Sequence, residues 1–182
     1  SIIVAVMDEG VMWAHPDLQA NMWINEDEIY KSDKDNDGNG YKGDVYGYNF
    51  AQQTPTIDWS SEGDTGHGTH VAGTIAAVNN NGEGVCGIAG GSGNGDGVKI
   101  MSIQIFSGNY GTSHIAKRKA SNMPPTTGRL SCNAVGVTTP HWLMSPLRCV
   151  VLPPMKNGHK IARWKRKLWI TLFTMRVRRM AP

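Results

Sequence analysis

The second part of this 182-residue chain has no acidic side chains. All 15 Asp and Glu residues lie within residues 1–106, whereas residues 107–182 hold 14 of the 18 Lys and Arg residues. The formal charge is therefore −11 for the first stretch and +14 for the second, although the whole chain sums to +3. This asymmetry is typical of a basic arm for nucleic acid or membrane, or it marks a tail that was not selected for folding.

Cysteines and long apolar runs are also scarce. The chain has three cysteines, and their scattered positions fit neither a metal site nor a disulfide framework. No apolar run approaches the ~20 residues of a membrane-spanning helix, and no basic segment followed by an apolar one opens the chain. Because the chain starts at Ser1 directly in a predicted strand, we expect a fragment whose targeting signal has been lost.

Three segments predict a parallel sheet with a helix. Ile2–Met7 is a continuous β-branched run that suits a strand buried on both faces, and Val98–Phe106 is typical of a second strand. Between them, Gly66–Val78 places apolar residues at helical spacing and predicts a helix that begins near His67. The order strand, helix, strand favours the α/β class, with the functional site at the carboxyl ends of the strands.

Two motifs place an aspartate and a histidine in a recognisable order. Residues 4–18 read VAVMDEGVMWAHPDL and residues 66–77 read GHGTHVAGTIAA. They resemble the aspartate and histidine motifs of subtilisin-like serine proteases (peptidase family S8, the subtilases). The resemblance continues through VKIMSIQIF at residues 98–106 and fades near residue 116. It implies a three-layer subtilisin-like fold with a parallel sheet and flanking helices, incomplete here, in which residues 1–116 are the N-terminal part of the catalytic domain.

The resemblance gives Asp8 and His67 catalytic roles. Asp8 would accept a hydrogen bond from Nδ1–H of His67 and leave Nε2 to take a proton from a serine. Glu9 departs from the family, which usually has Thr or Ser after the aspartate. Taken alone, Asp8 could be a turn or helix cap, and His67 with His70 could bind a metal, although two histidines without a third ligand make a weak site. The resemblance makes His70 structural.

The serine motif of the family, G-T-S-M-A-x-P, and its oxyanion-donating Asn are absent from the sequence. GTSHIA at residues 111–116 shares the first letters of this motif. However, Ser113 follows His67 by only 46 residues, and the final Pro of the motif is missing. We therefore predict that Ser113 starts and caps a helix and is not a nucleophile. The chain as written is expected to be inactive as a protease.

An acidic, glycine-rich loop matches a calcium-binding pattern. Residues 33–44 follow the 12-residue loop D-x-[DN]-x-[DN]-G-x5-E, with Asp in place of the final Glu. The predicted structural Ca²⁺ ligands are Asp33, Asp35, Asp37, Asn39 and Asp44. A solvated, turn-rich loop is the alternative. The family resemblance implies a second ion at Asp17 and Asn80, with one further ligand before Ser1.

The basic tail, residues 117–182, has two interpretations. A reading shifted by two bases turns residues 120–138 into the hypothetical string IKYAADNGAVILQCSWGYN, which resembles the helix and strand that follow in subtilisin-like proteases. We therefore hypothesise that the chain leaves its frame after about Ala116. Alternatively, residues 161–180 form a basic amphipathic helix that binds an anionic membrane, a partner groove or nucleic acid.

Taken together, the motifs predict a subtilisin-like serine endopeptidase that acts on peptide or protein substrates. The family implies a secreted or cell-envelope location, and we expect a monomer without a nucleic-acid partner or membrane span. A non-catalytic calcium-binding module is the alternative from a different functional class.

Overall fold

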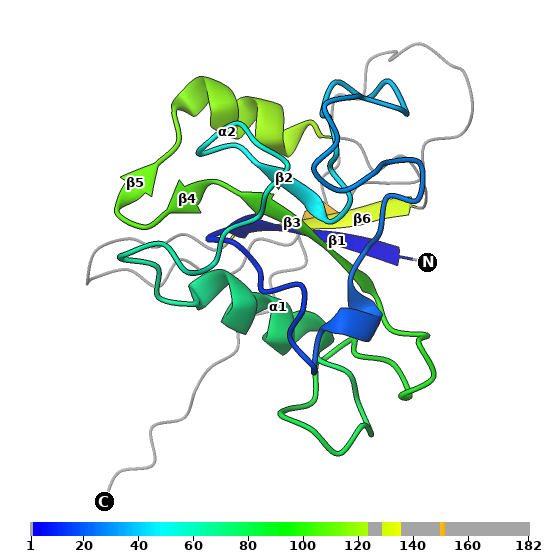
Figure 1. Ribbon diagram of the computed structural model, residues 1–182. Coiled ribbons are helices and arrows are strands. Elements are labelled where there is room, and N and C mark those ends of the chain that lie inside the picture. Colours follow the sequence, from blue (N-terminus) through cyan, green and yellow to red (C-terminus); the bar gives the residue numbers. More distant parts are fainter. Residues whose placement is uncertain (1, 124–128, 136–149, 152–182) are drawn as a thin grey trace, which may run out of the picture.

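A five-stranded sheet in the order β2-β3-β1-β6-β7 forms the centre of the protein (Figure 1). The computed structural model describes residues 2–123, 129–135 and 150–151. The strands of this sheet are β1 (Ile2–Asp8), β2 (Gly47–Asn49), β3 (Lys99–Gln104), β6 (Arg129–Val135) and β7 (Val150–Val151). β1 is parallel to β3 and β6, β2 is parallel to β3, and β7 is antiparallel to β6. The predicted parallel α/β sheet is confirmed.

Two helices, α1 (His67–Ala76) and α2 (His114–Ser121), lie on opposite faces of the sheet (Figure 1). Side chains of β1 alternate between the two faces. Val6 belongs to a buried cluster with Val71 of α1, whereas Met7 belongs to a second cluster with Ala116 of α2. Because successive strand residues point to opposite faces, the apolar run of β1 is buried on both sides, as its composition predicts.

The predicted strand at residues 98–106 is split in two. β3 ends at Gln104, and a separate antiparallel pair follows, formed by β4 (Phe106–Ser107) and β5 (Tyr110–Gly111). The break falls at Ile105, whose N–H donates to the carbonyl oxygen of Asp8 at 2.8 Å. A short 3-10 helix, η1 (Gln19–Asn21), is the remaining described element.

Ser113 caps α2, as the sequence predicts. Its Oγ accepts the N–H of Ala116 at 3.2 Å, which satisfies one of the unpaired donors at the start of the helix. The predicted amphipathic helix at residues 161–180 lies outside the described residues, and the frame-shift hypothesis stays a prediction. Within the described ranges, neither helix has the length and apolar character needed to cross a bilayer.

Candidate active site

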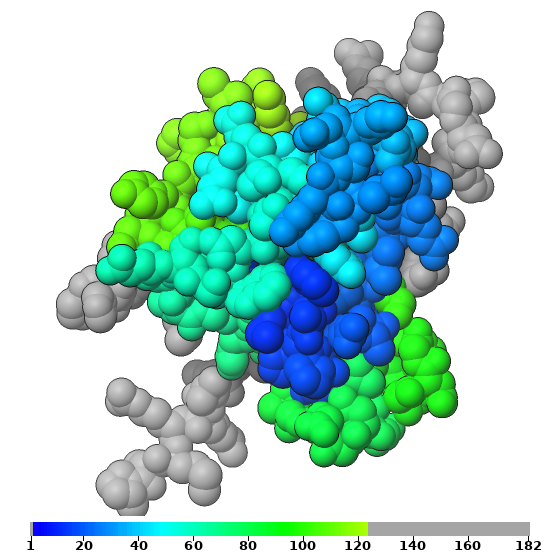
Figure 2. All heavy atoms as spheres, in the orientation of Figure 1, coloured from blue at the N-terminus to red at the C-terminus, as the bar shows by residue number. Residues whose placement is uncertain are grey.

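Asp8 and His67 meet at the carboxyl end of β1. Asp8 is the last residue of that strand and is fully buried, whereas His67 is the first residue of α1 and its side chain is 38% exposed. Nδ1 of His67 lies 2.8 Å from Oδ2 and 2.9 Å from Oδ1 of Asp8. In the space-filling view the N-terminal segment lies directly beside the segment that carries α1 (Figure 2). The structure therefore brings together the two residues that the motifs single out.

This contact fixes which ring nitrogen of His67 carries the proton. An ionised carboxylate only accepts hydrogen bonds, so Nδ1 must be the protonated nitrogen where it faces Asp8. Nε2 is then left with a free lone pair and can accept a proton from a nucleophile. The arrangement is that of a general base oriented by a buried acid.

Opposing influences act on the Asp8 carboxyl. Burial raises the pKa of Asp8 above 3.8, while hydrogen bonds from the His67 ring and the Glu9 N–H, together with attraction to His67, hold it down. The negative charge of Glu9 raises it further. The net effect is a raised pKa, so acidification removes the acceptor for His67 at a higher pH than for an ordinary aspartate.

Gln104 holds the surroundings of this pair in place. It is fully buried and lies opposite Asp8 in the β1–β3 register. Its Oε1 accepts the N–H of Asp58 at 2.9 Å, and its Nε2 donates to the carbonyl oxygens of Asp58 at 2.7 Å and Phe106 at 2.9 Å. Sequence reasoning missed this residue, and the only signal was a polar side chain at the end of an apolar strand.

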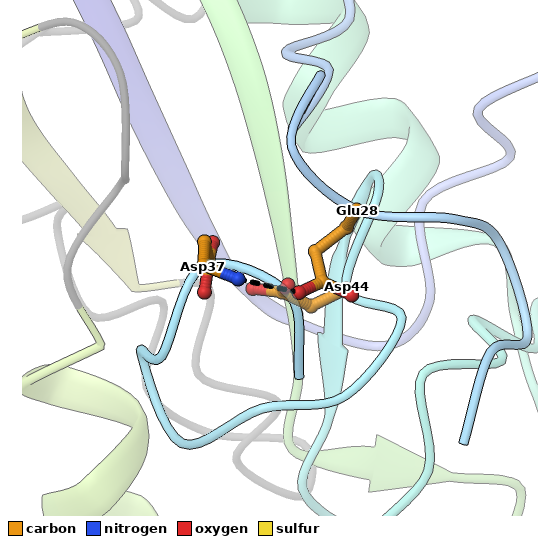
Figure 3. Close-up of side chains that lie close together, drawn as sticks. All are labelled: Glu28, Asp37 and Asp44. Carbon is orange, nitrogen blue, oxygen red and sulfur yellow. Dashed lines mark hydrogen bonds between the residues drawn. The ribbon is translucent and has the colours of Figure 1, made fainter. Parts of the chain in front are cut away.

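A separate acidic cluster lies in the loops before β2 (Figure 3). Carboxylate oxygens of Glu28, Asp37 and Asp44 lie within 4.8 Å of one another, and Glu28 and Asp44 are buried. Figure 3 shows the three side chains converging, with a hydrogen bond from the Asp37 N–H to Glu28. Asn25 donates Nδ2 to Asp37 at 2.7 Å and to Asp44 at 3.1 Å.

The cluster differs from the predicted 12-residue loop. Asp37 and Asp44 are shared by both. Glu28 precedes the motif and joins the group, whereas Asp33 and Asp35 lie outside it. Asp35 accepts the N–H of Asn39 at 3.1 Å and of Gly40 at 2.9 Å, so its carboxylate closes the turn of the loop. Asp33 is exposed.

Asn39 and the buried environment both act on Asp44. Nδ2 of Asn39 donates to Asp44 at 3.0 Å and to Asp37 at 3.1 Å, which places Asn39 at the edge of the cluster. Burial of the carboxyl is the main cause that raises the pKa of Asp44 to about 7, and the charges of Asp37 and Glu28 add to it. Hydrogen bonds from Asn39 and Asn25 act in the opposite direction.

At the second predicted ion site, the structure places Asn81 and not Asn80 against Asp17. Asp17 is buried and accepts Nδ2 of Asn81 and the N–H of Val85, both at 2.8 Å. Asn80 has a positive φ of 60° and donates its Nδ2 to the carbonyl oxygen of Ser92 at 3.2 Å. The structure therefore does not bring Asn80 into hydrogen-bond contact with Asp17, and the second ion site stays a prediction.

Comparison with known proteins places these features in one family. The subtilase family model of peptidase family S8 matches residues 1–160, which reaches past residue 116, where the motif resemblance fades. Subtilisin-like protease 1 of Plasmodium vivax is 42% identical over 89 residues, which cover 48% of this chain and 13% of that protein.

Two bacterial proteins are similar over a longer part of the chain. The extracellular protease of Xanthomonas campestris is 39% identical over 110 residues, covering 57% of this chain and 17% of that protein. Fervidolysin of Fervidobacterium pennivorans is 38% identical over 108 residues, which cover 58% of this chain and 11% of that protein. The chain thus spans less than a fifth of the length of these relatives.

Proposed function

The chain belongs to the subtilase family of serine peptidases, and on this basis we propose that His67 is the catalytic base of a serine endopeptidase site and that Asp8 orients it. The observation that carries the proposal is the 2.8 Å contact between Nδ1 of His67 and the buried Asp8 carboxylate. The nucleophile is the missing component, because the sequence has no G-T-S-M-A-x-P motif. As written, the chain is an inactive part of such a protease.

In the complete site, each residue has one task. Nε2 of His67 takes the proton of the serine hydroxyl as the serine attacks the scissile carbonyl, and then returns that proton to the leaving amine. Asp8 keeps the ring in the required tautomer and stabilises the imidazolium that forms. The substrate is a peptide or protein that adds as an extended strand beside the sheet. The name of the Xanthomonas relative supports an extracellular location.

The coding DNA tests the hypothesis that a shift of the reading frame removed the nucleophile. If the chain leaves its frame after about Ala116, the shifted frame is expected to encode a continued subtilase that contains a serine motif of the G-T-S-x-A type. A shifted frame that lacks this motif would contradict the hypothesis and favour a genuine basic tail.

A structural Ca²⁺ ion at Glu28, Asp37 and Asp44 is the second part of the proposal. Carboxylate oxygens are the ligands that Ca²⁺ prefers, and these three converge from two loop segments within 4.8 Å. Three neighbouring carboxylates repel one another, so a divalent cation between them would remove an unfavourable interaction. The ion would hold the segment around Glu28 against the loop at residues 37–44, which leads into β2.

A pair of variants distinguishes this cluster from the 12-residue loop pattern. At a free Ca²⁺ concentration 100-fold above Kd, binding is expected to stabilise the fold by about 2.7 kcal/mol. Asp44→Asn should remove most of that stabilisation, whereas Asp33→Asn, in the same loop but exposed, should leave it unchanged. Thermal melts with Ca²⁺ and with EDTA measure both, and equal losses in the two variants would contradict the assignment.

The Ca²⁺ effect is expected to grow with pH. Since the pKa of Asp44 is raised from 3.8 to about 7, the folded protein keeps a proton that the unfolded chain releases. In EDTA this carboxyl therefore lowers the free energy of unfolding as pH rises from 3.8 to about 7. Ca²⁺ competes with the proton, so the Ca²⁺-dependent rise in Tm should be larger at neutral pH than about two units below it. A pH-independent rise would argue against Asp44 as a ligand.

The acidic cluster also favours a non-catalytic calcium-binding module as the second candidate function. A chain completed with the serine segment separates the two candidates. Ca²⁺-dependent stabilisation without peptide hydrolysis would support the module, whereas hydrolysis that depends on His67 would support the protease.

A further inference from the structure

The start of α1 depends on a carboxylate from another element. Gly66 precedes the helix with a φ of 75° and has no side chain to accept the first N–H groups. Such groups have no partner within a helix. Here Oε2 of Glu9 accepts the N–H of His67 and the N–H of Thr65, both at 3.0 Å. Glu9 therefore does for α1 what a capping side chain does at other helices.

The Glu9 carboxylate is fully engaged in this contact. Its other oxygen, Oε1, accepts the hydroxyl of Thr65 at 3.0 Å, and the residue is only 5% exposed. Burial of a charge is costly unless hydrogen bonds satisfy it, and the three donors from Thr65 and His67 do so. The positive end of the helix dipole favours the same negative charge.

Two consecutive residues thus hold the same histidine from two sides. Asp8 binds the ring at Nδ1, and Glu9 binds the main chain of His67 at its N–H. The two acids are linked in turn, because Oδ1 of Asp8 accepts the N–H of Glu9 at 2.7 Å.

We propose that Glu9 is a positioning residue that keeps the His67 ring aligned with Asp8 by anchoring the first turn of α1. The inference rests on the proposed role of the Asp8–His67 pair. It adds that the alignment needs the Glu9 carboxylate, since Gly66 supplies no cap. Without this anchor, the first turn of α1 frays and the ring samples positions in which Nδ1 no longer faces Asp8.

The ring tautomer of His67 is the readout that a purely structural cap would not change. In the ¹⁵N-labelled chain, the shifts of the two ring nitrogens are expected to report mainly the Nδ1–H form of the neutral ring. Glu9→Ala should raise the Nε2–H population several-fold and should speed amide exchange at Thr65 and His67 by about tenfold or more. Glu9→Gln keeps an acceptor oxygen. Its changes in tautomer ratio and in amide exchange should therefore be smaller than those of Glu9→Ala.

Glu62→Gln is the matched control, because it removes the same charge from an exposed position in the loop that leads to α1. It should leave the tautomer ratio and the exchange rates unchanged. Faster exchange in Glu9→Ala and Glu9→Gln with an unaltered tautomer ratio would overturn the proposal, since Glu9 would then be a cap alone. If Glu9→Ala fails to fold, the tautomer ratio of Glu9→Gln decides. An unaltered chain dominated by the Nε2–H form would contradict the Asp8–His67 pair itself, and with it the proposed function.

Discussion

Gly68→Ala is expected to separate His67 from Asp8 and to destabilise the fold. A Cβ at Gly68 would lie 2.3 Å from the carbonyl oxygen of Glu9 and 3.3 Å from Cβ of Asp8. A main-chain oxygen cannot rotate out of the way as a side chain can, so α1 must move away from the end of β1. Overpacking of this kind costs about 1–3 kcal/mol. Urea unfolding measures the destabilisation, and the Nδ1–H resonance of His67 reports the loss of its partner.

Gly73→Ala provides the control within the same helix. A Cβ at Gly73 would meet nothing within 4 Å, so only the higher helix propensity of Ala remains. This variant should be more stable by about 1 kcal/mol and should keep the Asp8–His67 hydrogen bond. Equal effects of the two substitutions would contradict the close approach of α1 to β1.

The second large effect concerns a chain completed with its serine segment. In that protein, His67→Ala is expected to lower kcat by about 10⁶-fold, because removal of the base leaves the serine hydroxyl without a proton acceptor. His70→Ala should change kcat by no more than a few-fold, since His70 is exposed and, of the two histidines, His67 is the one hydrogen-bonded to Asp8. Steady-state hydrolysis of a peptide substrate measures both. Similar losses for the two histidines would favour a shared metal site instead.

Much of the fold could be predicted because its signals are local. The apolar run of β1 and the helical spacing of α1 can each be recognised from residues that are close together in the sequence. Because the apolar run stops just before Asp8, the sequence also predicts that Asp8 lies at the carboxyl edge of the sheet. The cap at Ser113 is likewise a local pattern. Gly68 stands in the histidine motif, but the sequence does not show why a glycine is needed there. The reason is the close approach of the Glu9 carbonyl oxygen, just after β1.

The residues that sequence reasoning missed are brought in by tertiary contacts. Glu28 joins Asp37 and Asp44 from outside the loop motif, so no spacing rule includes it. Asn81, and not Asn80, donates to Asp17, and three asparagines in a row give no sign of which one makes this contact. The hydrogen bonds of Gln104 link segments that are far apart along the chain.

Glu9 belongs to the same class. The sequence marks it only as a departure from a family pattern, and its function depends on the distance between the end of β1 and the start of α1. Two acids in succession gave no indication that one would bind the ring of His67 and the other its main chain.

We propose that the chain carries the Asp8–His67 pair of a protease site without the nucleophile. Labelling of the folded chain with a fluorophosphonate probe, followed by peptide mapping, tests this proposal most directly. These probes react with serines that an adjacent base activates. In a chain whose Nδ1–H resonance shows an intact Asp8–His67 pair, we expect no labelled serine. Labelling of Ser113 or another serine that disappears in His67→Ala would show that the chain already holds a complete site, and would contradict the proposed function as stated.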